Sequence, residues 1–325
     1  MRRSVRLISA GLAGLLLTGA GLSACADGKK TADPSATTSA SATMPAATGG
    51  SVKVTGSTKV KPVISVPKPF HVDKTTVDVI SKGTGAKLTS GELARVDYVG
   101  INATTDAEFD SSWKRSATSV FPLTQGGLIT GFLTGLVGQQ VGSRVEISIA
   151  PPDAYPQGNT AINVLATDSL VFVVDIRASG PLLTKAGGKA VAATGGFPKV
   201  TVKGGLPTAV AAEKSKVTAT KSAVLIQGTG ATVAKGKFLA FNYIAVTAKD
   251  GKLFDNSFAS APITIQSVTD DLGIPGLSTA LLGHKVGSRV VIVAPKALAS
   301  TTATLPTGVT KADTVVFVVD ILGVL

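Results

Sequence analysis

The chain has 325 residues, which favours two folded units over one compact domain. A single cysteine excludes an internal disulfide bond, and two histidines, His71 and His284, leave little for a zinc site. We expect no metal and no cofactor, and we interpret both histidines as surface or structural residues. The formal net charge of +12 comes without a basic stripe interleaved with aromatic residues, so nucleic acid is not an expected partner.

The N-terminal segment predicts export. Residues 1–6 include three arginines, and residues 7–24 carry no charge, which is typical of a secretory signal. The segment ends in Leu22-Ser23-Ala24-Cys25, which resembles a bacterial lipobox. In such signals the cysteine becomes the mature N-terminus and carries the lipid. We therefore expect a signal peptide over residues 1–24, lipidation of Cys25 and an extracytoplasmic, lipid-anchored location at the cell membrane. A plain signal peptide with a free cysteine is the alternative, and Arg2-Arg3 leaves a twin-arginine signal open.

A tether follows the cysteine. Residues 31–48 are almost entirely Ala, Thr, Ser and Pro, a composition that buries too little apolar surface to offset the entropy of ordering. We predict a disordered tether over residues 25–50.

An internal repeat governs the rest of the chain. The tetrapeptides that begin at Gly83 and Val141 recur at Gly228 and Val286, and the strand-like run from Val171 recurs from Val316, each at an offset of 145 residues. A period this long indicates a duplicated domain. Upstream, residues 62–66 resemble residues 198–202, so each unit begins near there. We predict domain 1 over residues 51–179, a Gly- and Ala-rich linker over 180–196, and domain 2 over 197–325.

Within a unit the pattern predicts strands and one short helix. Residues 93–101, 144–150 and 169–177 are rich in Val and Ile, whereas residues 131–137 carry apolar side chains at helical spacing. A half-buried sheet needs one amphipathic element to cover it, so the expected class is a small α+β domain.

Several motifs in domain 1 together resemble the FKBP-type peptidyl-prolyl cis-trans isomerases. They occur in the family's order and cover residues 83–178 well and 228–322 less well: Val96-Asp-Tyr-Val-Gly100, Phe109-Asp-Ser-Ser112, Leu128-Ile-Thr-Gly-Phe132, Val141-Gly-Ser-Arg144, Ala150-Pro-Pro-Asp-Ala-Tyr155 and Leu170-Val-Phe172. The resemblance implies two tandem domains, each a bent antiparallel sheet wrapped on one short helix, with an apolar proline pocket between sheet and helix.

The resemblance also implies the residues of the pocket. The aromatic walls would be Tyr98, Phe109, Phe132 and Phe172. Leu128 and Ile129 would form an apolar lip, with the backbone N–H of Ile129 as a donor to the substrate. Asp110 and Tyr155 would supply two polar contacts. Taken one by one, these aromatic and apolar residues are typical of an ordinary core, and only their joint pattern favours a pocket. Such a site needs neither histidine, cysteine nor metal, because rotation about an X-Pro bond breaks no bond.

The sequence departs from the family pattern in places. Phe132 stands where the family most often has Trp, Ser119 or a neighbour stands where another aromatic is common, and residues 156–159 precede a loop without the family's paired prolines. Trp113 is interpreted as a loop or rim residue.

Domain 2 is predicted to hold a degenerate pocket. It keeps Tyr243, Phe254, Asp255, Ile274 and Phe317, but Leu277 replaces the aromatic floor, and residues 295–300 contain no tyrosine. A peptide-holding role and a purely structural role for domain 2 both stay open.

The sequence thus predicts a prolyl isomerase that acts mainly through domain 1 and assists the folding of exported proteins, with their proline-containing segments as substrate and a macrolide as a further ligand of the pocket. Two alternatives compete with it: a lipoprotein that binds proline segments without turnover, and a structural envelope protein that binds no prolyl peptide.

Overall fold

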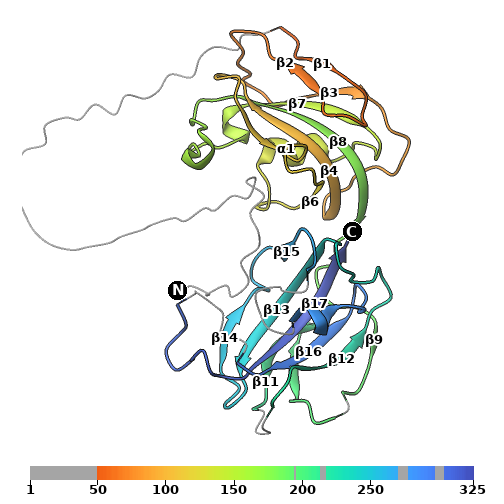
Figure 1. Cartoon of the computed structure of the whole chain (residues 1–325), viewed down its shortest axis with the longest axis vertical. Helices are drawn as coiled ribbons and strands as arrows, with labels where there is room; N and C mark the ends of the chain where they lie inside the picture. Colours follow the sequence, from red (N-terminus) through yellow and green to blue (C-terminus); the bar gives the residue numbers. More distant parts are fainter. Residues whose placement is uncertain (1–49, 194, 213–216, 270–276, 297–303) are drawn as a thin grey trace, which may run out of the picture.

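The computed structural model describes residues 50–193, 195–212, 217–269, 277–296 and 304–325. The predicted signal peptide, Cys25 and nearly all of the predicted tether lie outside these residues. The described residues form two large antiparallel β-sheets, each with a short helix against one face, as predicted, and two two-stranded hairpins (Figure 1). No described helix is both long enough and apolar enough to cross a bilayer.

The first sheet has the order β3-β7-β8-β4-β5, with β6 pairing to β4 beside β5. Strands β4 and β8 are its long central pair, and most of their buried positions carry apolar side chains. The elements of domain 1 are β1 (Lys53–Thr55), β2 (Val63–Ser65), β3 (Thr76–Ser81), β4 (Glu92–Asn102), β5 (Glu108–Ser111), β6 (Ser119–Pro122), α1 (Thr130–Leu136), β7 (Arg144–Ile149), two single-turn 3-10 helices (Pro151–Asp153 and Thr160–Ile162) and β8 (Leu170–Pro181).

The second sheet repeats this order as β14-β13-β17-β16-β12-β9, with β15 pairing to β13. The extra edge strand β9 lies in the segment 180–196 that was predicted as a linker, and β8 also runs into that segment. The elements of domain 2 are β9 (Lys189–Ala190), β10 (Val200–Lys203), β11 (Leu206–Val210), β12 (Lys221–Gln227), β13 (Leu239–Thr247), β14 (Leu253–Asn256), β15 (Ile263–Ile265), α2 (Leu277–Leu281), β16 (Arg289–Ala294) and β17 (Val315–Val324).

Helix α1 lies close to the sheet because two of its residues are glycines. A Cβ at Gly131 would lie 2.3 Å from Ile149, and one at Gly135 would lie 2.6 Å from Ile147, so larger residues would force the helix away from β7. The helix and the sheet face beneath it enclose the main core of domain 1.

A short hairpin covers the opposite face of each sheet. Hairpin 1 (β1 and β2) brings Ile64 onto Val99 and Val171, and hairpin 2 (β10 and β11) brings Val210 onto the outer face of the second sheet. Residues 62–66 contain the second strand of hairpin 1, whereas residues 198–202 contain the first strand of hairpin 2. The sequence match upstream of the repeat was therefore wrong, because it joined strands that are not equivalent.

One buried arginine fastens each hairpin. Arg144 makes a bidentate ion pair with Asp175, at 2.7 Å for both bonds, and donates to the carbonyl oxygens of Gly56 and Val60. In domain 2, Arg289 pairs with Asp320 at 2.6 and 2.7 Å and donates to Gly205 O. Desolvated charges are tolerated only when they are paired and hydrogen-bonded, and both arginines meet that condition.

The single tryptophan and the two histidines lie away from the predicted pocket. Trp113 follows β5 in a turn and packs against the cluster beneath hairpin 1, with the Arg177 guanidinium 5.6 Å from its ring centroid. His71 is buried, with Nδ1 3.1 Å from Ser169 Oγ, and the pKa of half-buried His284 is lowered by burial. Among the described residues, no group of three His, Cys, Asp or Glu side chains could hold a metal ion.

Candidate functional site

Five aromatic rings converge between the domain 1 sheet and α1. Phe132 on α1 lies 5.1 Å from Phe172 on β8 and 6.1 Å from Tyr98 on β4, measured between ring centroids. Phe109 on β5 packs edge-on against Phe172 at 5.6 Å. Phe121 on β6 completes the cluster, 5.8 Å from Tyr98 and 5.6 Å from Phe132. The four aromatic residues predicted as pocket walls thus belong to one connected cluster, in which Phe109 contacts Phe172, although their part in catalysis stays a prediction.

A polar network lies at one side of this cluster. The Tyr98 hydroxyl donates to Asp110 Oδ2 at 2.5 Å, and Arg115 donates both to Asp110 and, at 2.9 Å, to the Tyr98 oxygen. Burial, followed by the charge of Asp110, raises the pKa of Tyr98 well above its usual range. Tyr98 therefore stays protonated and holds the Asp110 carboxylate at the edge of the aromatic cluster.

Tyr155 belongs to the same site. It is 5% exposed, and its pKa is raised to about 12, first by burial and then by the nearby charge of Asp110. The segment that follows Tyr155 is shaped by asparagine instead of paired prolines: the Asn159 side chain accepts from the N–H of Ala161, and Asn163 takes a left-handed conformation at φ 54°. The predicted departure from the family loop therefore corresponds to a 3-10 turn.

Leu128 and Ile129 are buried at the start of α1. Ile129 is the residue that precedes the first helical turn, and the first amides of a helix have no carbonyl partner within it. Its position is thus compatible with the donor role that the resemblance implied.

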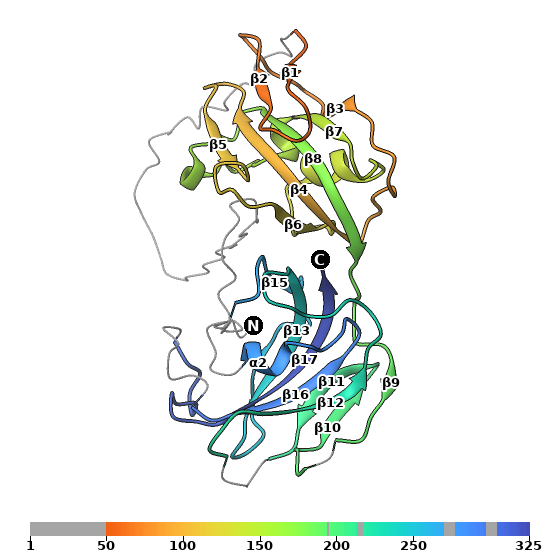
Figure 2. The ribbon, with the colours of Figure 1, turned by 45° about the vertical axis from the view of Figure 1, so that its right-hand side comes forward.

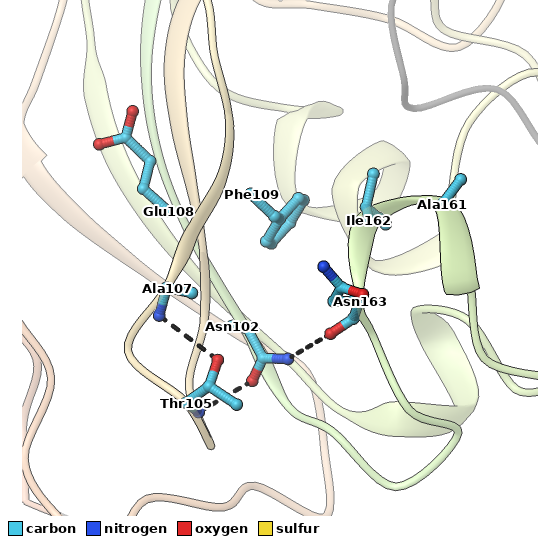
Figure 3. Close-up of a pocket in the computed structure, with 8 residues that line it drawn as sticks. All are labelled: Asn102, Thr105, Ala107, Glu108, Phe109, Ala161, Ile162 and Asn163. Carbon is cyan, nitrogen blue, oxygen red and sulfur yellow. Dashed lines mark hydrogen bonds between the residues drawn. The ribbon is translucent and has the colours of Figure 1, made fainter.

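The accessible part of the site lies beside Phe109, which is half-buried. A cavity of about 450 Å³ opens there, with Phe109 on one side and the loop residues Ile162 and Asn163 on the other (Figure 3). Asn102 ties the two sides together, because its amide nitrogen donates to Asp168 at 2.7 Å and to Asn163 O at 3.4 Å. The ring of Phe109 is therefore the part of the aromatic cluster that a ligand in this cavity would meet first.

Two residues of the site were missed in the sequence. Phe121, and not Ser119, is the additional aromatic: Ser119 accepts from Arg115 at 3.3 Å, whereas Phe121 lies opposite Ala94 and joins the cluster. The only available signal for Phe121 was its place in the short apolar run Val120-Phe121-Pro122. Arg115 had no signal of its own, since a turn places it over Tyr98.

Domain 2 has only some of the residues that form the domain 1 site. Tyr243 lies 5.8 Å from Phe317 and donates to Asp255 at 2.5 Å, Leu277 is buried on α2, and Phe254 packs on the core from the edge strand. The predicted residue Ile274 lies outside the described residues. Leu239 pairs with Ile265 where Ala94 pairs with Phe121, so an aliphatic residue replaces the fifth aromatic.

The turn that carries Arg115 is also changed in domain 2. Six residues, 113–118, separate Ser112 from Ser119, whereas five, 258–262, separate Ser257 from Ile263, and none of the five is basic. Ser112 and Ser257 occupy equivalent positions, because each accepts from the N–H of its domain's tyrosine. The repeat offset therefore drops by one residue within this turn.

Gly100 is a further difference between the two sites. A Cβ there would lie 2.8 Å from the Phe172 ring and 2.9 Å from the Phe109 ring. Gly100 pairs with Phe172 and Asp110, and Ala245 pairs with Phe317 and Asp255 in the same way, so Ala245 is its counterpart. The methyl group that domain 2 carries would displace the two rings that meet over Gly100 in domain 1.

Comparison with known proteins identifies the family. The model of the FKBP-type peptidyl-prolyl cis-trans isomerases matches residues 85–177 and again residues 230–322, which together make up more than half of the chain. The chain belongs to this family, with two copies of its domain. Each matched range includes the central strands, the helix and the aromatic residues of its domain.

Individual relatives agree with this assignment. The chain is 39% identical over 117 residues to a probable FK506-binding protein of Corynebacterium glutamicum, covering 36% of this chain and 96% of that protein. It is 33% identical over 100 residues to the FKBP-type 22 kDa peptidyl-prolyl cis-trans isomerase of Escherichia coli, covering 30% of this chain and 46% of that protein. Among solved structures, FkpA from Escherichia coli matches at 27% identity and a TM-score of 0.30, covering 33% of this chain and 48% of that chain.

Proposed function

We propose that domain 1 catalyses cis-trans isomerisation of X-Pro bonds in exported proteins, at the outer face of the membrane. The observation that carries the proposal is the convergence of five aromatic rings beside the Tyr98, Asp110 and Arg115 network. The FKBP family binds proline peptides and FK506-type macrolides, and membership of that family supports a prolyl ligand for this pocket.

The chemistry of the pocket follows from the nature of the barrier. Twisting an amide removes its partial double bond and costs roughly 18–20 kcal/mol, so uncatalysed exchange takes tens to hundreds of seconds. The twisted amide is less delocalised and less polar than the planar one. A site that replaces water with aromatic carbon therefore favours the twisted form, and a donor at the amide oxygen adds to that preference.

The residues of domain 1 have distinct roles in this scheme. Phe109, Phe132 and Phe172 surround the prolyl ring and exclude water. Tyr98 and Asp110 form the polar edge, and the Tyr155 hydroxyl and the Ile129 N–H are the donors offered to the peptide. Tyr155 is protonated at physiological pH, as an ordinary tyrosine is, and burial raises its pKa further, to about 12.

The anchor is the second part of the proposal. The arginine-rich start, the uncharged run and the lipobox-like Leu22-Ser23-Ala24-Cys25 support lipidation of Cys25 and an extracytoplasmic location. A tether of small and polar residues would hold the two domains away from the bilayer. Labelling with a fatty-acid probe tests this part: label is expected on the wild-type chain and not on Cys25→Ser, and equal labelling of both would contradict it.

A protease-coupled assay on a proline peptide tests the activity. Wild-type full-length chain is expected to accelerate isomerisation, and a Phe109→Ala and Tyr155→Phe double variant to lose at least about 90% of that acceleration. Phe254→Ala is the matched control in domain 2 and is expected to leave the rate unchanged. If the double variant equals wild type, the assigned site is wrong.

A binding role without turnover is the second candidate. It is favoured for domain 2, which keeps the Tyr243–Asp255 hydrogen bond but has an aliphatic residue in place of Phe132 and Phe121. It predicts that a proline peptide binds the chain with ordinary affinity and without rate acceleration.

A further inference from the structure

Strand β6 of domain 1 lies against domain 2. Figures 1 and 2 show β6 at the end of domain 1 that faces β15. Gln266, the residue that follows β15, binds the backbone of Val120 on β6. Its amide oxygen accepts from the Val120 N–H at 2.8 Å, and its amide nitrogen donates to the Val120 carbonyl oxygen at 2.9 Å. One side chain of domain 2 thus binds both backbone groups of a single residue in domain 1.

These two hydrogen bonds satisfy the outer edge of β6. Among the described strands β6 pairs only with β4, and Val120 lies opposite Arg95 in that pair. In an antiparallel strand the N–H and C=O of one residue point to the same side, so the groups that bind Gln266 point away from β4. Val120 is 3% exposed, and buried backbone groups without partners are costly. Gln266 therefore supplies the hydrogen bonds that a neighbouring strand supplies elsewhere in the sheet.

Apolar contacts lie beside the two hydrogen bonds. Leu93 and Val120 of domain 1 pack with Phe238 and Ala240 of domain 2, and all four residues are buried. Leu93 is in the first turn of the pairing between β4 and β6, and Ala240 is on β13. Gln266 therefore binds β6 at a packed contact between the domains.

The support runs from domain 2 to domain 1 and is not returned. Phe121 of β6 and Ile265 of β15 occupy equivalent positions, so Pro122 stands where domain 2 has Gln266. Proline has no side-chain amide, so Pro122 cannot bind the edge of β15 in the same way. The duplication has thus given only domain 2 the residue that supports its neighbour.

The strand that Gln266 holds is also part of the prolyl pocket. Side chains alternate along a strand, so Phe121 points to the side opposite Val120. Its ring centroid lies 5.8 Å from that of Tyr98 and 5.6 Å from that of Phe132, and the residue is 2% exposed. Phe121 therefore supports two walls of the pocket from behind, and a shift of β6 at Val120 would move both.

We propose that Gln266 is a positioning residue for the domain 1 pocket, and that domain 2 assists turnover by holding β6 in place. The inference rests on the proposed function, because it concerns the site to which that function assigns catalysis. Gln266 acts through Val120 and Phe121 on the walls formed by Tyr98 and Phe132. This role of domain 2 requires no ligand in its own pocket.

Gln266→Met tests the role in the full-length chain, because methionine keeps the length of the side chain and removes only its amide. We expect kcat/KM for a proline peptide to fall about threefold to fivefold, mainly through a higher KM, because displaced walls hold the prolyl ring less well in the ground state and the transition state alike. Partial unfolding alone would lower kcat and leave KM unaltered.

Gln140→Met is the matched control. Gln140 is also half-buried, its amide donates to the backbone oxygen of Gly85 at 3.3 Å, and it lies between α1 and β7. Its loss is expected to leave both kcat and KM unchanged. An equal rise of KM in both variants would mean that the effect is not specific to β6 and would overturn the inference.

A double-mutant cycle identifies Phe121 as the link. Phe121→Ile introduces the residue that domain 2 has at the equivalent position. In this background Gln266→Met is expected to change kcat/KM by less than about 1.5-fold, because coupled residues do not act additively. An effect of Gln266→Met that is equally large with and without Phe121→Ile would contradict the proposed route.

Hydrogen exchange tests the contact without any turnover. The Val120 N–H is expected to exchange at least about tenfold faster in Gln266→Met than in wild type, whereas the amides of β4 and β8 keep their protection. Equal exchange of the Val120 N–H in the two proteins would show that Gln266 does not protect β6 in solution, and the inference would be wrong.

The outcomes separate this inference from the proposed function. If wild type accelerates isomerisation and Gln266→Met keeps the wild-type kcat and KM, the isomerase activity holds and the positioning role is wrong. If wild type gives no acceleration, the proposed function fails and the positioning role fails with it, whereas the exchange rate of Val120 still shows whether Gln266 binds β6.

Discussion

The two domains keep the same framework but line their pockets differently. Arg144 with Asp175 and Arg289 with Asp320 form matching buried ion pairs that fasten matching hairpins. Between helix and sheet, by contrast, Leu277 of domain 2 stands in the place of Phe132. The aromatic Phe121 pairs with Ala94 in domain 1, whereas the aliphatic Ile265 pairs with Leu239 in domain 2. The outer faces of the sheets therefore keep the same hairpin attachment, whereas the inner faces carry the differences between the two pockets.

A similar contrast exists on β7 and β16. Glu146 is buried on the outer side of β7, where its carboxylate accepts from Ser148 at 2.7 Å. It pairs with Val173 as Val291 pairs with Val318, so domain 2 has a valine at the equivalent place. Only domain 1 therefore carries a buried ionisable group at this position.

Removal of one ion-pair partner is expected to have the largest effect on either domain. Asp175→Asn leaves the Arg144 charge buried without a carboxylate, which typically costs about 3–5 kcal/mol of unfolding free energy. Trp113 is the only tryptophan of the chain and packs beneath hairpin 1, so its fluorescence during urea unfolding reports on domain 1. Asp320→Asn is the matched variant and should instead lower the domain 2 transition seen by circular dichroism. A loss below about 1 kcal/mol would mean that the hairpin carbonyls alone satisfy Arg144.

A pH-dependent difference between the domains is expected from Glu146. Burial, aided by the charge of Asp78, raises its pKa from 4.5 to about 7 despite the Ser148 hydrogen bond. The folded state thus binds this proton more tightly than the unfolded state does, and domain 1 loses stability as pH rises from about 4.5 to 7. Glu146→Gln should stabilise domain 1 by about 3 kcal/mol at pH 8 and by nearly nothing at pH 4, because a tenfold difference in proton affinity between the folded and unfolded states corresponds to about 1.4 kcal/mol.

The domain 2 transition is the internal control for that experiment, because Val291 cannot ionise. Parallel pH profiles for wild type and Glu146→Gln, recorded by Trp113 fluorescence between pH 4 and 8, would contradict the assignment.

Gly100→Ala would make domain 1 resemble domain 2 at a single position. The added methyl group lies under 3 Å from the Phe109 and Phe172 rings, and such overpacking costs about 1–3 kcal/mol. We expect kcat/KM for a neutral prolyl peptide to fall about tenfold, because the rings that enclose the proline must move. The reverse change, Ala245→Gly, should leave the rate of the full chain unaltered, and a rise in rate would show that domain 2 contributes to turnover.

The smallest effect is expected for Arg115→Gln. This residue is partly exposed, so its charge is screened, and Tyr98 keeps its own hydrogen bond to Asp110. A reduction of kcat/KM by about twofold to threefold, weaker at high salt, is expected in the same assay. An unchanged rate would indicate that the shorter turn of domain 2 is not a cause of its difference from domain 1.

Features that depend on local sequence patterns could be predicted, whereas features that depend on contacts between distant segments mostly could not. The duplication, the strands and the helix near residues 131–137 followed from sequence periodicity, and the motifs indicated that Tyr98, Phe109, Phe132 and Phe172 lie in one place. Arg115 could not be predicted, because its place over Tyr98 depends on the path of a six-residue turn. The hydrogen bonds between Gln266 and Val120, which join the two domains, had no sequence signal either, since nothing in one repeat specifies which face of the other it contacts.

The Arg144 hydrogen bonds that attach hairpin 1 to the sheet also determine how domain 1 responds to a pulling force. The described chain enters the domain through β1, and the Arg144 side chain links the loop between β1 and β2 to the centre of the sheet. A pull on the chain from its N-terminal side would therefore strain hairpin 1 and the Arg144 bonds before it reached β4 and β8. Under tension, hairpin 1 would detach first from the outer face of the sheet, and the pocket on the opposite face would keep its shape.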